Sequence, residues 1–144
     1  MSIYRSDEEV RALVRAFEDR TLPKSEWTHA AHLTVGMHYC LENPPGLARN
    51  LMRDGIHWLN EAHGTPNTED SGYHETLTCF WIDVIRRFLA GRDRGEGLSA
   101  LANSLVAEFG DPKLPFSYYS RQLLFSPEAR FSLVAPDLRP CDIL

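Results

Sequence analysis

Three histidines lie within a stretch of the chain that has no charged side chain. The stretch runs from Trp27 to Leu41 and contains His29, His32 and His38. An uncharged run of this length is typical of a helix that is buried on nearly all sides. Buried polar groups need partners, and histidine is the usual residue for metal ligation or proton transfer near neutral pH. The segment therefore predicts a functional site.

A histidine from a later helix joins two of these in the predicted site. His29 and His32 are three residues apart, so their side chains share one face of a helix. His74 falls within the apolar arc of its own helix and is expected to point inward, whereas Glu75 is expected to face solvent. We expect His29, His32 and His74 to converge on one cavity and to bind a divalent metal, Zn²⁺, Mn²⁺ or Ni²⁺. Three neutral imidazoles with one open position suit the activation of water for hydrolysis.

Two residues near this pair of histidines extend the predicted site. Glu26 stands three residues before His29 and is the candidate catalytic group, either orienting that imidazole or acting as a general base. Gly36 follows His32 by one turn, and a glycine inside a helix is unfavourable by up to about 1 kcal/mol relative to alanine. Room for a ligand, or the close approach of another backbone, would explain a glycine there. We therefore count Gly36 among the substrate-binding residues.

Further candidates for substrate binding lie later in the chain. Thr78 is one helical turn beyond His74, and Tyr118 and Arg121 follow a proline-rich turn in the last third. An arginine at a pocket suits a carboxylate or phosphate on a ligand. The polar loop 64–72 directly precedes His74, so we expect it to border the pocket and to act as a mobile lid.

The other histidines have structural explanations. His38 points away from the predicted site and is expected to be a core residue with its hydrogen bonds satisfied. His57 lies away from the apolar stripe of its helix and is expected to be solvated. His63 occupies the last turn before Gly64, where an imidazole can meet the free carbonyls of a helix end.

Two other functions fit the same residues. The first is a metal-free binding module, whose apolar pocket holds a small molecule with His29, His32 and His74 as hydrogen-bonding groups. The second is an interaction protein in which these histidines form an ordinary buried polar network. Metal-dependent hydrolysis, ligand binding and protein interaction therefore all remain open at this point.

The elements that must position these residues are helices. Apolar periodicity and capping residues predict helices over 7–20, from Ser25 as cap to the turn at 43–46, over 47–63, 73–89 and 98–109, and two shorter ones near 116–125 and after Ser126. No segment alternates with a period of two. The sequence thus predicts an all-α fold, a compact antiparallel helical bundle with additional short C-terminal helices, formed by one domain over residues 1–144.

One detail of this prediction concerns the helix over 47–63. Its apolar side chains recur at Leu47, Leu51, Trp58 and Ala62, which predicts that this stripe faces the core.

Composition narrows the classes of partner. The formal net charge is −5, and no basic run offsets it, which argues against a nucleic acid or an anionic membrane as partner. The first ten residues contain no apolar segment of the kind found in signal peptides, and no stretch approaches the length needed to span a bilayer. Cys40, Cys79 and Cys141 are far apart and form no CxxC pair, which is typical of reduced thiols. We expect a cytoplasmic protein with a small-molecule partner and leave its oligomeric state open.

Two sequence blocks carry a resemblance to known proteins. The segments LPKSEWTHAAHL and GYHETLT resemble a group of small uncharacterised bacterial proteins that have these blocks at this separation. That resemblance covers most of the chain and implies a bacterial helical protein, but no activity. The chain is also loosely similar to DinB/YfiT-type helical bundles, which hold a divalent metal with three histidines. Their close histidine pair is four residues apart and late in the chain, whereas the pair here is three apart and early, so the similarity implies no residue roles.

Overall fold

The computed structural model describes residues 3–93 and 95–140. Within these residues every regular element is helical, so the all-α fold with short C-terminal helices is confirmed. The α-helices are α1 (Asp7–Glu18), α2 (His29–Glu42), α3 (Pro45–His63), α4 (Glu75–Ala90), α5 (Leu98–Phe109), α6 (Arg121–Leu124) and α7 (Pro127–Phe131). Two 3₁₀ turns are η1 (Lys24–Glu26) and η2 (Leu114–Ser117). The described part of the chain contains no strand, and one isolated bridge joins Thr68 to Ser71.

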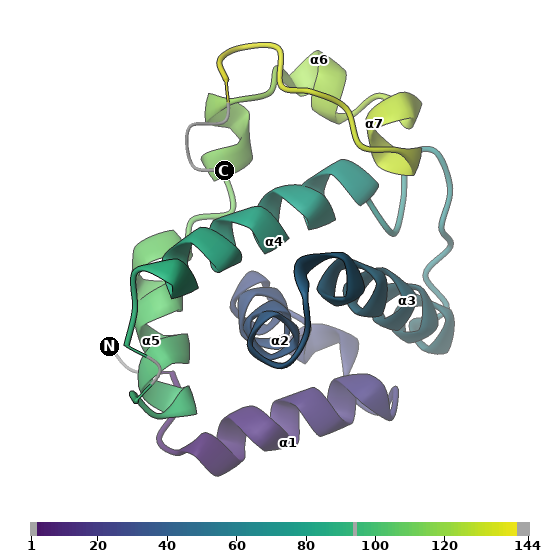
Figure 1. The fold of residues 1–144 in the computed structure, drawn as a ribbon. Coiled ribbons are helices and arrows are strands. Elements are labelled where there is room, and N and C mark those ends of the chain that lie inside the picture. The colour runs from purple at the N-terminus through teal and green to yellow at the C-terminus, as the bar shows by residue number, and fades with distance from the viewer. Residues whose placement is uncertain (1–2, 94, 141–144) are drawn as a thin grey trace.

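Helix α2 lies at the centre of the fold. In Figure 1 it is seen nearly along its axis, with α1, α3, α4 and α5 around it, and each of these four helices packs against it. No residue from His29 to Leu41 is exposed. The expectation of a helix buried on nearly all sides is therefore confirmed, and its two first-turn histidines are partly buried.

The start of α2 differs from the prediction. Thr28, not Ser25, is the N-cap, and its hydroxyl accepts a hydrogen bond from the backbone N–H of Ala31 at 3.2 Å. Ser25 lies in η1, and Trp27 has φ −83° and ψ 68°, which is outside the helical region. Serine and threonine are both good capping residues, and Thr28, which directly precedes the helix, forms the cap. Glu26 consequently lies before the helix and does not share a helix face with His29.

Helix α3 faces the core with a different stripe from the predicted one. Its buried residues are Ala48, Met52, Gly55, Ile56, Leu59 and Asn60. Leu47 and Trp58 of the predicted stripe are each 47% exposed. Two small residues explain the difference, because Ala48 and Gly55 let neighbouring helices approach the backbone closely. The helix is thereby rotated so that Met52, Ile56 and Asn60 point toward α2 and α4.

Gly55 and Gly46 provide a matched test of this close approach. A Cβ on Gly55 would lie 2.5 Å from Cζ of Phe17, whose side chain is 1% exposed and stacked on Trp27. We expect Gly55→Ala to lower the free energy of unfolding by about 2 kcal/mol, because a rigid ring must move. A Cβ on Gly46, near the start of the same helix, would meet nothing within 4 Å. Gly46→Ala should therefore raise the free energy of unfolding by about 0.5 kcal/mol. Urea denaturation measures both, and equal effects would contradict the packing of α1 on α3.

The C-terminal elements pack on the side of α4 that faces away from α2 (Figure 1). Their core is a cluster of Phe80, Val84, Tyr118, Tyr119 and Leu124. Thr76 of α4 donates a hydrogen bond to the carbonyl of Ser132 and accepts one from the N–H of Val134. Among the described helices none combines the length and apolar character that crossing a bilayer requires.

Candidate functional site

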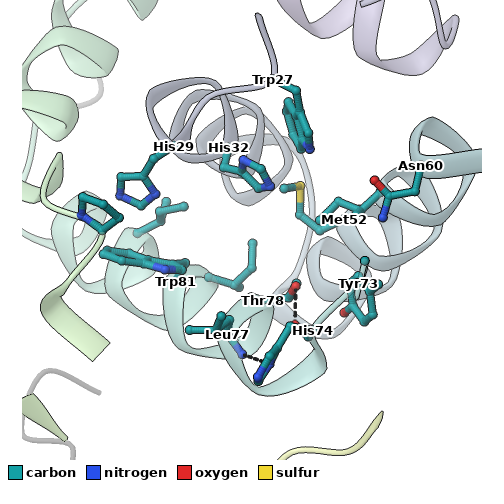
Figure 2. A pocket seen from close by; sticks show the side chains of 16 residues that line it. Trp27, His29, His32, Met52, Asn60, Tyr73, His74, Leu77, Thr78 and Trp81 are labelled. Carbon is teal, nitrogen blue, oxygen red and sulfur yellow. Dashed lines mark hydrogen bonds between the residues drawn. The ribbon is translucent and has the colours of Figure 1, made fainter. Parts of the chain in front are cut away.

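A cavity of about 410 Å³ lies between α2, α3 and the first half of α4. Figure 2 shows the side chains that line it: Trp27, His29, His32, Gly36, Met52, Ile56, Asn60, Gly72, Tyr73, His74, Leu77, Thr78, Trp81, Ile82, Ile85 and Pro112. None of these is an aspartate, glutamate, lysine or arginine. The walls are mainly aromatic and aliphatic, and the polar groups are three imidazoles, an amide, two hydroxyls and the indole N–H groups of Trp27 and Trp81.

The structure brings several of the predicted site residues to this cavity. His29, His32 and His74 all line it, and so do Gly36 and Thr78. His29 and His32 come from the first turn of α2, while His74 stands at the start of α4. Because each imidazole also contacts backbone, its hydrogen bonds decide what it can offer to a ligand.

The other predicted site residues lie elsewhere. Glu26 is exposed in η1 and is not part of the cavity wall, because the chain between it and His29 is not helical. Tyr118 is buried in the C-terminal cluster and lies under the guanidinium of Arg139. Arg121 is exposed, with its guanidinium over the ring of Phe116. The structure therefore gives these three no contact with the histidine cavity.

His32 presents a bare ring nitrogen to the cavity. Its Nδ1 lies 3.0 Å from the carbonyl oxygen of Thr28, which can only accept, so Nδ1 carries the proton. Nε2 is then a lone-pair acceptor, and no described residue hydrogen-bonds to it. The ring is stacked on Trp27, with centroids 3.8 Å apart. The stacking and the Thr28 bond hold the imidazole in one orientation.

His29 is held in the same way by a different carbonyl. Its Nε2 lies 3.1 Å from the carbonyl oxygen of Phe109, so that nitrogen carries the proton and Nδ1 keeps a lone pair. Its ring packs against Trp81, with centroids 4.5 Å apart. The end of α5 therefore fixes the position of a residue at the start of α2.

His74 has no free nitrogen. Its Nδ1 accepts the backbone N–H of Leu77 at 3.1 Å, as the N-cap of α4. Its Nε2 then carries the proton and donates to the carbonyl of Leu124 at 2.6 Å. The inward orientation expected from the sequence is present, because the side chain is buried. Both ring nitrogens, however, form hydrogen bonds with backbone groups.

These bonds bear on the expected metal site. Two lone pairs, on His29 Nδ1 and His32 Nε2, are left by the three imidazoles. In the part of the chain that the structure describes, no group of three histidine, cysteine, aspartate or glutamate side chains could hold a metal ion. For His74 to become a ligand, its ring would have to give up the N–H of Leu77. Metal binding therefore stays a prediction.

The three imidazoles are neutral at neutral pH. Burial lowers the pKa of His32 to about 4, and it also lowers the pKa of His29. The pKa of His74 is lowered by burial and by the nearby charge of Arg130. Because the cavity wall has no charged side chain either, the site has the electrostatics of an uncharged pocket.

The group that approaches Gly36 closely is the side chain of Ile85, not the backbone of another helix. A Cβ on Gly36 would lie 2.7 Å from Cδ1 of Ile85, which belongs to α4. The glycine therefore allows α2 and α4 to approach closely at the floor of the cavity. Gly36 also lines the cavity, so the expected room for a ligand is present beside that contact.

Several lining residues were missed by the sequence reasoning. The predicted orientation of α3 followed its larger apolar residues and was wrong. It therefore missed Met52, Ile56 and Asn60, which line the cavity. Trp81 lies one helical turn beyond the candidate Thr78, and this spacing would have pointed to it. Tyr73 carried no signal beyond its position next to His74.

Glu75 and His57 differ from expectation. Glu75 does not face solvent freely: it accepts two hydrogen bonds from the guanidinium of Arg53 and one from the hydroxyl of Tyr73. These bonds lower the pKa of its carboxyl group. His57 is half-buried, with its ring 4.6 Å from that of Tyr73. His63 does lie at the end of α3, where its Nε2 donates to the carbonyl of Leu22.

The loop before His74 borders the cavity at Gly72. The amide oxygen of Asn67 accepts the N–H of Tyr73 at 2.9 Å and the side-chain amide of Asn60 at 3.0 Å. Thr68 donates its N–H to the carbonyl of Ser71. The position of the loop agrees with the expectation, and its mobility stays a prediction.

No protein-family model, curated protein or solved structure matches this chain. Both sequence resemblances stay predictions, and the function is argued from the site alone.

Proposed function

We propose that this protein binds a small, uncharged and mainly apolar molecule that carries a hydrogen-bond donor. The observation that carries the proposal is the unpartnered Nε2 of His32, held by stacking and by the Thr28 carbonyl at the wall of a cavity without charged side chains. This nitrogen is open to the cavity and is already held in one orientation, so a ligand that donates a hydrogen bond to it gains affinity.

The size and walls of the cavity support a ligand with an aromatic or aliphatic ring. Its volume of about 410 Å³ falls in the range of small-molecule sites, roughly 300–1,000 Å³. Trp27 and Trp81 provide flat apolar surfaces on two sides, and Met52 provides a polarisable side chain that adapts to the shape of a ligand.

A second acceptor favours the same class of ligand. The Nδ2 of Asn60 donates to Asn67, so its Oδ1 is the amide atom left for the cavity. It adds to the lone pairs of His29 Nδ1 and His32 Nε2, so that acceptors come from two different helices. A molecule such as a phenol or an alcohol matches acceptors, whereas a ketone or ether offers no donor to them.

The metal-dependent hydrolase is a second candidate, favoured by the shared cavity of His29, His32 and His74. It requires that His74 turn away from Leu77 and Leu124 when a metal binds. Zn²⁺, Mn²⁺ or Ni²⁺ would then stabilise the fold, by about 2.7 kcal/mol at a hundred times the dissociation constant. A lowered histidine pKa assists this reading, because a metal needs the neutral imidazole.

Calorimetric titration with 2-naphthol and with its methyl ether tests the proposal. The two probes have the same ring system, but the ether has no donor. We expect 2-naphthol to bind about fivefold more tightly, which corresponds to one net hydrogen bond of about 1 kcal/mol. In His32→Leu that difference should vanish while both probes still bind.

His38→Leu is the matched control, because His38 is on the same helix but does not line the cavity. It should keep the preference for 2-naphthol. Absence of binding by both probes, or a preference that survives His32→Leu, would overturn the proposal. Thermal melting with added Zn²⁺, Mn²⁺ and Ni²⁺ completes the experiment: a rise that is lost in His74→Asn would favour the metal candidate instead.

A further inference from the structure

A second cavity, of about 300 Å³, lies on the other side of Tyr73. Unlike the first, it is lined by charged side chains, from Arg53 and Glu75 and from Arg130 of α7, together with His57 and Asn67. The balance of these charges decides what the cavity can hold.

Two of the charges neutralise each other. The guanidinium of Arg53 donates to both carboxylate oxygens of Glu75, at 2.9 and 2.7 Å. The hydroxyl of Tyr73 adds a third hydrogen bond to Oε1 of Glu75, at 2.6 Å. This carboxylate is well satisfied, and among the described residues no other acidic side chain lines the cavity. It leaves little capacity for a second cation.

Arg130 is the remaining cation. One terminal nitrogen, Nη1, donates to the backbone carbonyls of Gly72 and Tyr73, at 3.0 and 3.3 Å. Among the described residues it has no carboxylate within ion-pair distance, and its Nε is buried without a hydrogen-bond partner. A half-buried guanidinium without a counter-charge is unfavourable, and its fork of donors matches a planar oxyanion.

Asn67 offers a neutral donor to the same cavity. Its Oδ1 accepts from the backbone N–H of Tyr73, and this fixes which end of the amide is oxygen. The other end, Nδ2, donates to no described residue. The cavity thus holds a free amide donor beside an unpaired guanidinium, and its net charge is positive in a protein whose formal charge is −5.

We propose that this second cavity binds a small oxyanion group, a carboxylate or a phosphate, in the fork of Arg130 with Asn67 as an additional donor. The anion supplies the missing counter-charge and accepts from Nη2, the terminal nitrogen for which no described residue is an acceptor. This site is independent of the proposed apolar-ligand cavity, because the residues that bind the anion do not line that cavity. Either proposal can fail without the other.

The direct test observes the Nε–Hε resonance of Arg130 by NMR while the protein is titrated with sodium acetate and, separately, with inorganic phosphate. Sodium chloride at matched ionic strength is the reference. We expect a saturable shift with at least one oxyanion and none with chloride. The anion that saturates at the lower concentration identifies the source as a carboxylate or a phosphate.

Variants assign the shift to this site, and their binding is followed at the side-chain amide resonances of Asn67, because Arg130→Gln and Arg130→Lys have no guanidinium Nε–Hε to observe. Arg130→Gln should weaken binding of the better anion by about tenfold or more, as loss of charge-assisted hydrogen bonds predicts. Arg130→Lys, which keeps the charge but not the fork, should weaken it by a smaller factor. Arg121→Gln, an exposed arginine of the same C-terminal segment that does not line this cavity, should bind like the wild type. If the wild-type resonance responds equally to chloride, or Arg121→Gln weakens binding as much as Arg130→Gln, the proposal is overturned.

Discussion

Lowering the pH from about 7 to about 4 is expected to destabilise the fold by about 3 kcal/mol through His32 alone. Burial depresses the pKa of this imidazole to about 4 in the folded protein, against 6.5 for an ordinary histidine. Between these two values the unfolded chain binds a proton that the folded protein does not bind. The contribution of His32 to the free energy of unfolding is therefore fully present above pH 6.5. It falls as the pH drops below 6.5 and is lost entirely once the pH is below the folded-state pKa of about 4.

Urea denaturation at about pH 7.5 and about pH 4.5 measures this dependence. Protonation of carboxylates with lowered pKa values, such as that of Glu75, also destabilises the protein in acid. The effect of His32 is therefore measured as the difference in pH dependence between variants. His32→Leu should flatten the pH dependence by most of the stated amount. His38→Leu keeps all three cavity histidines and should retain the wild-type slope. Identical slopes for the two variants would contradict the burial of His32 as a neutral group.

Replacing His74 by alanine should lower the free energy of unfolding by about 3 kcal/mol. The substitution removes the cap of α4, because no side chain then accepts the N–H of Leu77. It also leaves the carbonyl of Leu124, whose side chain is buried, without the donor that His74 provides. Both losses fall on the junction between α4 and the C-terminal helices.

His74→Asn separates the two contributions. Asparagine is a good N-cap but is too short to reach Leu124, so we expect it to recover about 1 kcal/mol of the loss. Chemical denaturation of both variants gives the comparison. A loss below about 1 kcal/mol in His74→Ala, or no recovery in His74→Asn, would show that these bonds do not stabilise the junction as described.

Local signals in the sequence predicted the elements well. Ser6 precedes an amphipathic run, and the structure has it as the cap of α1, with its hydroxyl accepting the N–H of Glu9. The uncharged run after Trp27 predicted the buried helix because burial excludes unpaired charges. The inward position of His74 followed from the apolar arc of α4. Each of these inferences uses only residues within about one helix length.

The hydrogen bonds of the site could not be predicted in this way. His29 is bound by the carbonyl of Phe109 and His74 by that of Leu124, and both partners lie in distant elements. Backbone carbonyls carry no residue-specific signal in a sequence. Whether an imidazole is a ligand or a structural donor therefore depends on the tertiary arrangement, which periodicity does not contain.

The buried face of α3 was predicted wrongly for a related reason. A prediction from periodicity gives most weight to large apolar side chains. This helix, however, packs through Ala48 and Gly55, whose small size lets neighbouring elements approach its backbone. The pairing of Arg53 with Glu75 was missed as well, because it joins two helices whose relative rotation depends on that same packing.

Tyr73 is the partition between the two cavities, and it is fastened at three points. Its N–H donates to Asn67, its carbonyl accepts from Arg130, and its hydroxyl donates to Glu75. Two of these bonds hold the backbone of Tyr73, and the third holds the far end of its ring. The two cavities therefore share one residue: an occupant of one cavity that displaces Tyr73 alters the affinity of the other, and thermodynamic linkage makes the two effects equal.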